Sequence, residues 1–127
     1  MVPPATSAPV APSSTLDAQA LARLRELDPD GRAGVVRRVL EAYQGSLRRG
    51  LEQLAALPPP SPEAVSALAH TLKSSSASVG ALELAQVCSE VERRLKAGEH
   101  QGLERDIAHL LEHGKAALHA VATILQG

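Results

Sequence analysis

The chain has 127 residues, and its 13 lysines and arginines nearly balance its 14 acidic residues, which leaves a net charge of −1. This length fits one domain with a modest core. The near-neutral charge and an aromatic content of 1% argue against a nucleic-acid partner, which would need basic patches and stacking rings. No apolar run approaches the roughly 20 residues that span a bilayer, so we expect no membrane insertion. A single cysteine, Cys88, excludes an internal disulfide and is typical of a reducing compartment, so we expect a cytoplasmic protein.

The first 15 residues, MVPPATSAPVAPSST, are rich in proline, alanine, serine and threonine. This composition predicts a disordered tail or linker over residues 1–15. Order is expected from Leu16 on, where Asp17 can cap a short helix. The apolar positions of that helix are Leu21, Leu24 and Leu27. The sequence Asp28-Pro29-Asp30-Gly31 then predicts a turn.

A long second helix is predicted from Arg32 to Leu57. Apolar residues at three- and four-residue spacing give it one buried face. These residues are Val36, Val39, Leu40, Tyr43, Leu47, Leu51 and Leu54. Gly45 and Gly50 should weaken the helix by up to about 1 kcal/mol each, and they would allow a neighbouring helix to approach closely. Three consecutive prolines follow and end the helix.

Three further helices complete the predicted fold. Ser61 followed by Pro62 is typical of a helix start, and this third helix ends near Gly80. A fourth helix is predicted from Ala81 to Lys96, and a fifth from Gly102 on. We find no strand alternation and no internal repeat. Residues 16–127 are therefore predicted to form an all-α domain, an antiparallel up-and-down four-helix bundle with a short extra N-terminal helix over one end.

His70 lies on the outer face of the predicted third helix. On a helical wheel the apolar residues of this segment fall on one side, and His70 falls on nearly the opposite side among small residues. Lys73 is one helical turn away on the same outer face. An exposed imidazole can act as a nucleophile and hold a phosphoryl group. Lys73 at about 4 Å would offset the phosphoryl charge by roughly 1 kcal/mol in water-like surroundings, and by a few kcal/mol if shielded.

Glu92 stands at the edge of the apolar face of the predicted fourth helix. A carboxylate in this position is partly desolvated and needs a hydrogen-bond donor. An antiparallel neighbour carrying His70 could supply one ring N–H, which would orient the imidazole and leave the other nitrogen as nucleophile. Pairing with Lys96 at i+4 is the alternative. The sequence alone does not decide between these two partners.

The pattern around His70 resembles the histidine-containing phosphotransfer (HPt) domains of bacterial and eukaryotic phosphorelays. The matching positions are Ala69, His70, Lys73, Ser75, Ser76, Gly80, Cys88 and Glu92. The resemblance implies that His70 is the phosphoacceptor, that Lys73 offsets the phosphoryl charge and that Glu92 orients the imidazole. Ser74 stands where the family usually has glycine directly after the lysine. Its hydroxyl would lie beside the phosphoryl group and could donate to a phosphoryl oxygen.

The resemblance also implies a function: reversible phosphoryl transfer between His70 and aspartates of response-regulator receiver domains. The expected partners are receiver domains, a hybrid sensor histidine kinase, or both, and the protein is expected to be a monomer. No cofactor of its own is expected, because Mg²⁺ would sit on the receiver. No phosphate-binding loop or kinase motif is present, so we expect no autonomous kinase activity. The alternative is a non-catalytic helical module that docks a kinase or receiver without accepting phosphate.

Other residues with reactive side chains carry weaker signals. His109 and His113, at i and i+4, could in principle bind a metal. No Glu-x-x-His pair elsewhere completes such a site, so we predict no metal site. Cys88 is expected to be a small buried apolar residue. His100 and His119 carry no signal.

Overall fold

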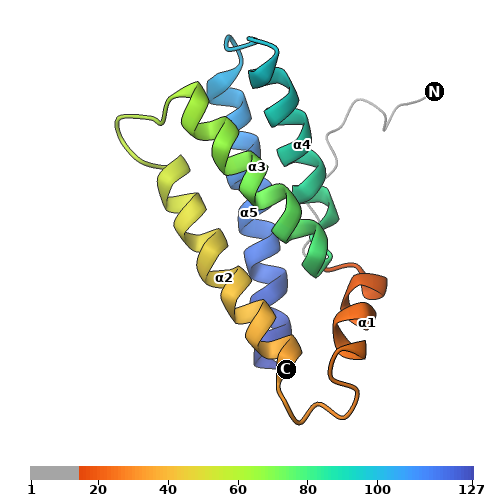
Figure 1. Cartoon of the computed structure of the whole chain (residues 1–127). Coiled ribbons are helices and arrows are strands. Elements are labelled where there is room, and N and C mark those ends of the chain that lie inside the picture. Colours follow the sequence, from red (N-terminus) through yellow and green to blue (C-terminus); the bar gives the residue numbers. More distant parts are fainter. Residues whose placement is uncertain (1–14) are drawn as a thin grey trace, which may run out of the picture.

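The computed structural model describes residues 15–127, and these residues form five helices. The helices are α1 (Ala18–Glu26), α2 (Val35–Leu54), α3 (Pro62–Val79), α4 (Leu82–Lys96) and α5 (Leu103–Gln126). Helices α2 to α5 run alternately up and down as a bundle, and α1 lies at one end of it (Figure 1). The all-α prediction is confirmed for the described residues. Apart from Thr15, the predicted N-terminal tail lies outside them.

Helix ends follow the predicted capping residues in two cases. The Asp17 side chain accepts a hydrogen bond from the Ala20 backbone N–H at 3.0 Å and so caps α1. Ser61 caps α3 in the same way through Ala64 N–H at 3.1 Å, with Pro62 as the first helical residue. None of the helices among residues 15–127 is both long enough and apolar enough to cross a membrane.

The second helix begins three residues later and ends three residues earlier than predicted. The Asp28 carboxylate accepts hydrogen bonds from the backbone N–H groups of Ala33 and Val35, at 3.3 and 3.2 Å. Gly31 and Gly34 take positive φ angles of 72° and 65°, which other residues rarely adopt. The turn therefore continues through Gly34. At the other end, Ala55 is the C-cap residue of the helix, and Leu57, directly before the first proline, is disfavoured in helical backbone.

The first helix also departs from its predicted pattern. It ends at Glu26, so Leu27 is the C-cap residue and is 68% exposed rather than packed. Ala20 and Leu21 are the buried residues that hold α1 against the bundle. The backbone N–H of Asp17 also donates to the carbonyl of Gly80, at 2.8 Å, and so ties the start of α1 to the end of α3.

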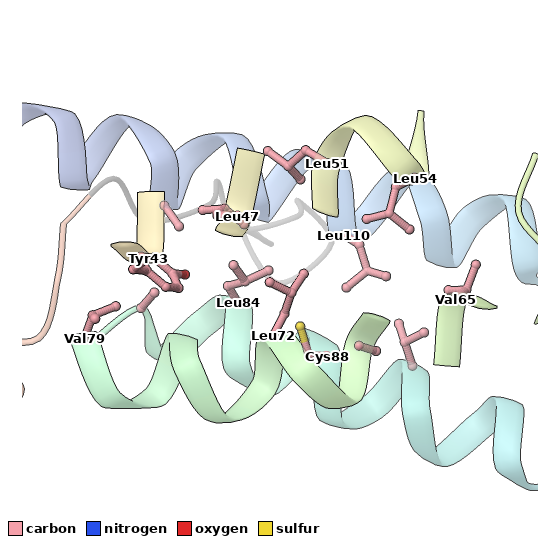
Figure 2. Close-up of a cluster of buried hydrophobic side chains, with 14 of the residues drawn as sticks. Tyr43, Leu47, Leu51, Leu54, Val65, Leu72, Val79, Leu84, Cys88 and Leu110 are labelled. Atoms are coloured by element: carbon pink, nitrogen blue, oxygen red, sulfur yellow. The ribbon is translucent and has the colours of Figure 1, made fainter. Parts of the chain in front are cut away.

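The core lies between α2, α3, α4 and α5 and consists almost entirely of aliphatic side chains (Figure 2). The predicted face of α2 is confirmed: five of its seven residues are buried, and Val36 and Val39 pack against the core. Tyr43 is an aromatic residue of this core and carries a polar group. Its hydroxyl shares a 2.8 Å hydrogen bond with the Ser76 hydroxyl. This bond satisfies two buried polar groups inside the bundle.

Two glycines allow close contacts between neighbouring helices. A Cβ added at Gly50 would lie 3.2 Å from Leu68 Cδ2, so α2 and α3 approach closely there, as predicted. A Cβ at Gly114, which sequence reasoning did not single out, would overlap the Leu51 side chain where α5 meets α2. Gly45 does not serve such a contact, because the atom near its Cβ position belongs to Arg49 of the same helix. The two glycines therefore allow α2 to lie close to both α3 and α5.

Candidate functional site

His70 projects from the middle of α3 toward solvent. The residue before it, Ala69, is fully buried, and Leu72 on the next turn is 2% exposed. The His70 side chain itself is 65% exposed. The packing of α3 on the core therefore turns the imidazole outward, as the helical wheel predicts.

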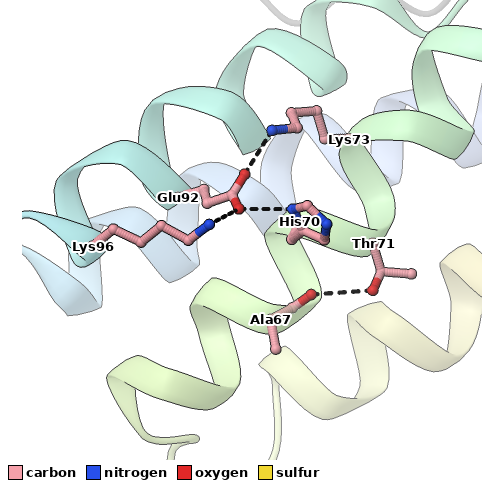
Figure 3. Close-up of polar contacts among 6 residues, drawn as sticks. All are labelled: Ala67, His70, Thr71, Lys73, Glu92 and Lys96. Atoms are coloured by element: carbon pink, nitrogen blue, oxygen red, sulfur yellow. Dashed lines mark hydrogen bonds and ion pairs between the residues drawn. The ribbon is translucent and has the colours of Figure 1, made fainter.

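Glu92 of α4 forms a hydrogen bond with the imidazole of His70. Its side chain is only 5% exposed, and its Oε2 lies 2.8 Å from His70 Nδ1 (Figure 3). A carboxylate can only accept, so Nδ1 carries the proton and donates. In the neutral ring Nε2 is then unprotonated. Figure 3 shows this second ring nitrogen pointing away from Glu92.

Two lysines hold the same carboxylate. Lys73 Nζ lies 2.7 Å from Oε1, and Lys96 Nζ lies 2.7 Å from Oε2 (Figure 3). The hydrogen bond from Lys73, then that from Lys96 and, to a smaller extent, that from His70 lower the pKa of Glu92 to about 2, against the opposing effect of desolvation. Both partners that the sequence left open for Glu92 are therefore present at once.

The charges of this cluster favour an anion. One carboxylate faces two ammonium groups, so the cluster carries a net charge of +1 when the imidazole is neutral. Both ammonium groups are already bonded to the carboxylate, so the charges are in place before any ligand arrives. An incoming phosphoryl group would meet a positive field next to His70 Nε2.

An open groove of about 550 Å³ lies beside His70, between α3 and α4. The α3 side of the groove carries mostly short side chains, among them Ser66, Ala67 and Thr71, together with Glu63 near the start of the helix. The other side carries Glu92, Leu95, Lys96 and His100. The Thr71 hydroxyl donates to the Ala67 carbonyl at 3.1 Å, so it is turned back toward its own helix. The groove leaves the imidazole accessible to a large partner.

The three consecutive serines of α3 have different surroundings. Ser76 is buried and bonded to Tyr43. Ser75 donates to the backbone carbonyls of Leu72 and Thr71 in the preceding turn, at 3.3 and 3.4 Å. Ser74 is exposed one turn after His70, and its carbonyl accepts from the Ser78 hydroxyl at 3.0 Å. Of the three, Ser74 is the one whose side chain is on the His70 face.

Sequence reasoning missed two contributors to this region. It treated Lys96 only as a competitor for Glu92, whereas Lys96 and His70 share the same carboxylate oxygen. It gave His100 no role, yet His100 lines the groove. The i, i+4 spacing of Glu92 and Lys96 was the available signal for Lys96, but the wheel of one helix does not show which face meets α3. His100 lies beyond the end of α4, where helical spacing gives no signal.

Comparisons with known proteins agree with this geometry. The profile of the Hpt domain family matches residues 38–124. Among solved structures, the chain is similar to the crystal structure of histidine-containing phosphotransfer protein B (HptB) from Pseudomonas aeruginosa PAO1. The TM-score is 0.74 and the sequence identity 27%, over 87% of this chain and 94% of that one. No curated protein matches the chain. Because the family match extends over well more than half of its residues, the chain belongs to the Hpt domain family.

Proposed function

We propose that this protein is a histidine phosphotransfer protein of a two-component phosphorelay, which carries a phosphoryl group on His70 Nε2. One observation carries the proposal: an exposed imidazole whose Nδ1 is bonded at 2.8 Å to a buried carboxylate. A histidine that served only solubility would not need a desolvated carboxylate as its partner. Family membership supports the same function.

The hydrogen bond from Nδ1 to Glu92 prepares the ring for nucleophilic attack. It holds the tautomer in which Nε2 has a free lone pair, and it fixes the direction of that lone pair. Nε2 attacks the phosphorus of an aspartyl phosphate on the partner. The P–N bond forms, the P–O bond breaks, and the aspartate leaves as a carboxylate. The ring then gains positive charge, which the Glu92 carboxylate stabilises through Nδ1–H.

The two lysines divide the work of charge compensation. A phosphoryl group brings about two negative charges. Lys73 is on the same helix as His70, one turn away, and its amine can turn from Glu92 Oε1 to a phosphoryl oxygen. Lys96 then remains bonded to Oε2, so the buried carboxylate keeps a cationic partner throughout. Ser74 adds a neutral hydroxyl on the same face.

The open groove beside His70 suits a receiver domain as partner. Short side chains around the imidazole let the partner's phosphoaspartate approach, and the groove has room for a protruding element. Transfer of this kind depends mainly on positioning and on charge stabilisation. We expect the receiver to supply Mg²⁺, and a hybrid sensor kinase to be the alternative partner. The protein would act as a cytoplasmic monomer.

Phosphotransfer from a labelled receiver tests the proposal. The wild-type protein is incubated with a phosphorylated receiver domain and Mg²⁺, alongside His70→Gln and, as a matched control, His119→Gln on the exposed face of α5. We expect wild type and His119→Gln to gain acid-labile, base-stable label, and His70→Gln to gain none. A wild-type protein that binds the receivers yet takes up no label would favour the non-catalytic docking module instead.

A further inference from the structure

The α5 face carries a second cluster of metal-ligating side chains, which the phosphotransfer site does not use. His109, Glu112 and His113 each offer one ligand atom, and these atoms all lie within 4.8 Å of one another. The two imidazoles meet edge to face, with ring centroids 5.2 Å apart. We propose that these three residues bind one divalent transition-metal ion, with Zn²⁺ as the best fit.

The helix itself brings the ligands together. Positions i, i+3 and i+4 lie on neighbouring turns of one face, so the backbone of α5 already sets their spacing. His109 and Glu112 are exposed, which leaves their ligand atoms accessible to an ion from solvent. The prediction of no metal site rested on the lack of a Glu-x-x-His pair on another helix. It did not consider Glu112, which completes a three-residue set on α5 alone.

His113 has surroundings typical of a metal-binding histidine. Its side chain is 13% exposed, and its buried Nδ1 has no hydrogen-bond partner among residues 15–127. Glu83 Oε1 of α4 lies 4.0 Å from this Nδ1. Because Nδ1 is enclosed, Nε2 is the nitrogen available to an ion. An ion on Nε2 makes Nδ1–H a stronger donor, so Glu83 would close on it and orient the ring.

The chemistry of the donors selects the ion. Two imidazole nitrogens and one carboxylate oxygen match the ligands of zinc sites that keep one position for water. Mg²⁺ and Ca²⁺ prefer oxygen ligands throughout, so they should bind poorly. A bound ion would join three residues of α5 and, through Glu83, would couple them to α4.

Zinc titration of the full chain, first freed of metal by a chelator, tests the proposal. We expect one Zn²⁺ per chain by calorimetry, and a Tm that rises with Zn²⁺ but not with Mg²⁺. His109→Ala and His113→Ala should each abolish saturable binding, and Glu83→Gln should weaken it by about 10- to 100-fold. His119→Ala, on the same helix, is the matched control and should bind as wild type does.

The variants also separate this site from the phosphotransfer site. His70→Gln should lose phosphotransfer and keep zinc binding, because none of the proposed ligands belongs to α3. Absence of binding to the wild-type chain would overturn the proposal. Circular dichroism would show whether the helices of His109→Ala and His113→Ala are intact. If these folded variants bound Zn²⁺ with the affinity of wild type, the proposal would also be overturned.

Discussion

Replacement of Lys73 by alanine tests how this domain compensates the phosphoryl charge. The substitution removes one of the two ammonium groups at Glu92, and Lys96 and His70 still hold the carboxylate. The fold should therefore survive with the Nδ1–Glu92 hydrogen bond in place. What is lost is the cation one turn from Nε2, so transfer to His70 should slow.

The expected size follows from Coulomb's law. Two unit charges about 4 Å apart interact by about 1 kcal/mol in water and about 4 kcal/mol at an effective dielectric constant of 20. The Lys73 side chain is 39% exposed, which places it nearer to the water limit, at about 1–2 kcal/mol. That range corresponds to a loss of about 5- to 30-fold in the transfer rate. Lys96, at 66% exposure, should matter less when replaced, by about 2- to 5-fold.

Rapid-quench measurement of label transfer from a phosphorylated receiver is the appropriate assay. Lys115→Ala is the matched control, because Lys115 is the third and last lysine of the chain and is exposed on α5. We expect its rate to equal that of wild type within a factor of two. If Lys73→Ala also stays within that factor, or if Lys115→Ala slows transfer equally, local charge compensation by Lys73 is refuted.

Three further predictions concern stability and reactivity. The pKa of Glu92 is lowered to about 2, so its ionised form stabilises the fold above its ordinary pKa of 4.5. This contribution is lost as the pH falls from 4.5 toward 2. The free energy of unfolding in urea should therefore differ less between pH 3 and pH 6 for Glu92→Gln than for wild type. Gly80→Ala should lower the free energy of unfolding by about 3 kcal/mol, because φ at Gly80 is +89° and the added Cβ would lie 2.7 Å from the Asp17 backbone nitrogen. Gly98→Ala is the control in the same unfolding assay. It should cost only about 1 kcal/mol, because φ is +84° but the space around Gly98 is open. Burial raises the pKa of the Cys88 thiol to about 12, so a thiol reagent at pH 8 should label the native protein slowly and the urea-unfolded protein fast; equal rates would contradict the buried position.

Much of the fold could be predicted because it depends on one helix at a time. The buried face of α2 and the caps at Asp17 and Ser61 follow from spacing and from side-chain chemistry within a few residues. The start of α2 was missed because Asp28 reaches backbone groups five and seven residues ahead, which extends the turn. The exposure of Leu27 follows from the early end of α1, and periodicity alone does not show where a short helix stops.

The direction of each site side chain on its own helix could be predicted from the sequence. Contacts between side chains of different helices could be predicted only in part. The helical wheel placed His70 outward and Glu92 at the edge of the core, and the structure shows both positions. It could not show that Lys73 and Lys96, from different helices, meet at one carboxylate, because that requires the register of α3 against α4. The overlap of Gly114 with α2 was missed for the same reason, since it needs the identity of the neighbouring helix.

Every residue of the polar cluster comes from one helical hairpin, α3 and α4, between Pro62 and Lys96. Contacts of short sequence separation cost little loop entropy. The polar contacts at His70 therefore lie within this hairpin, whereas the packing of α3 and α4 on α2 and α5 sets which way the imidazole faces. Substitutions on α3 and α4 can accordingly change the polar contacts at His70 directly, whereas substitutions on α2 or α5 reach the site only through the shared core.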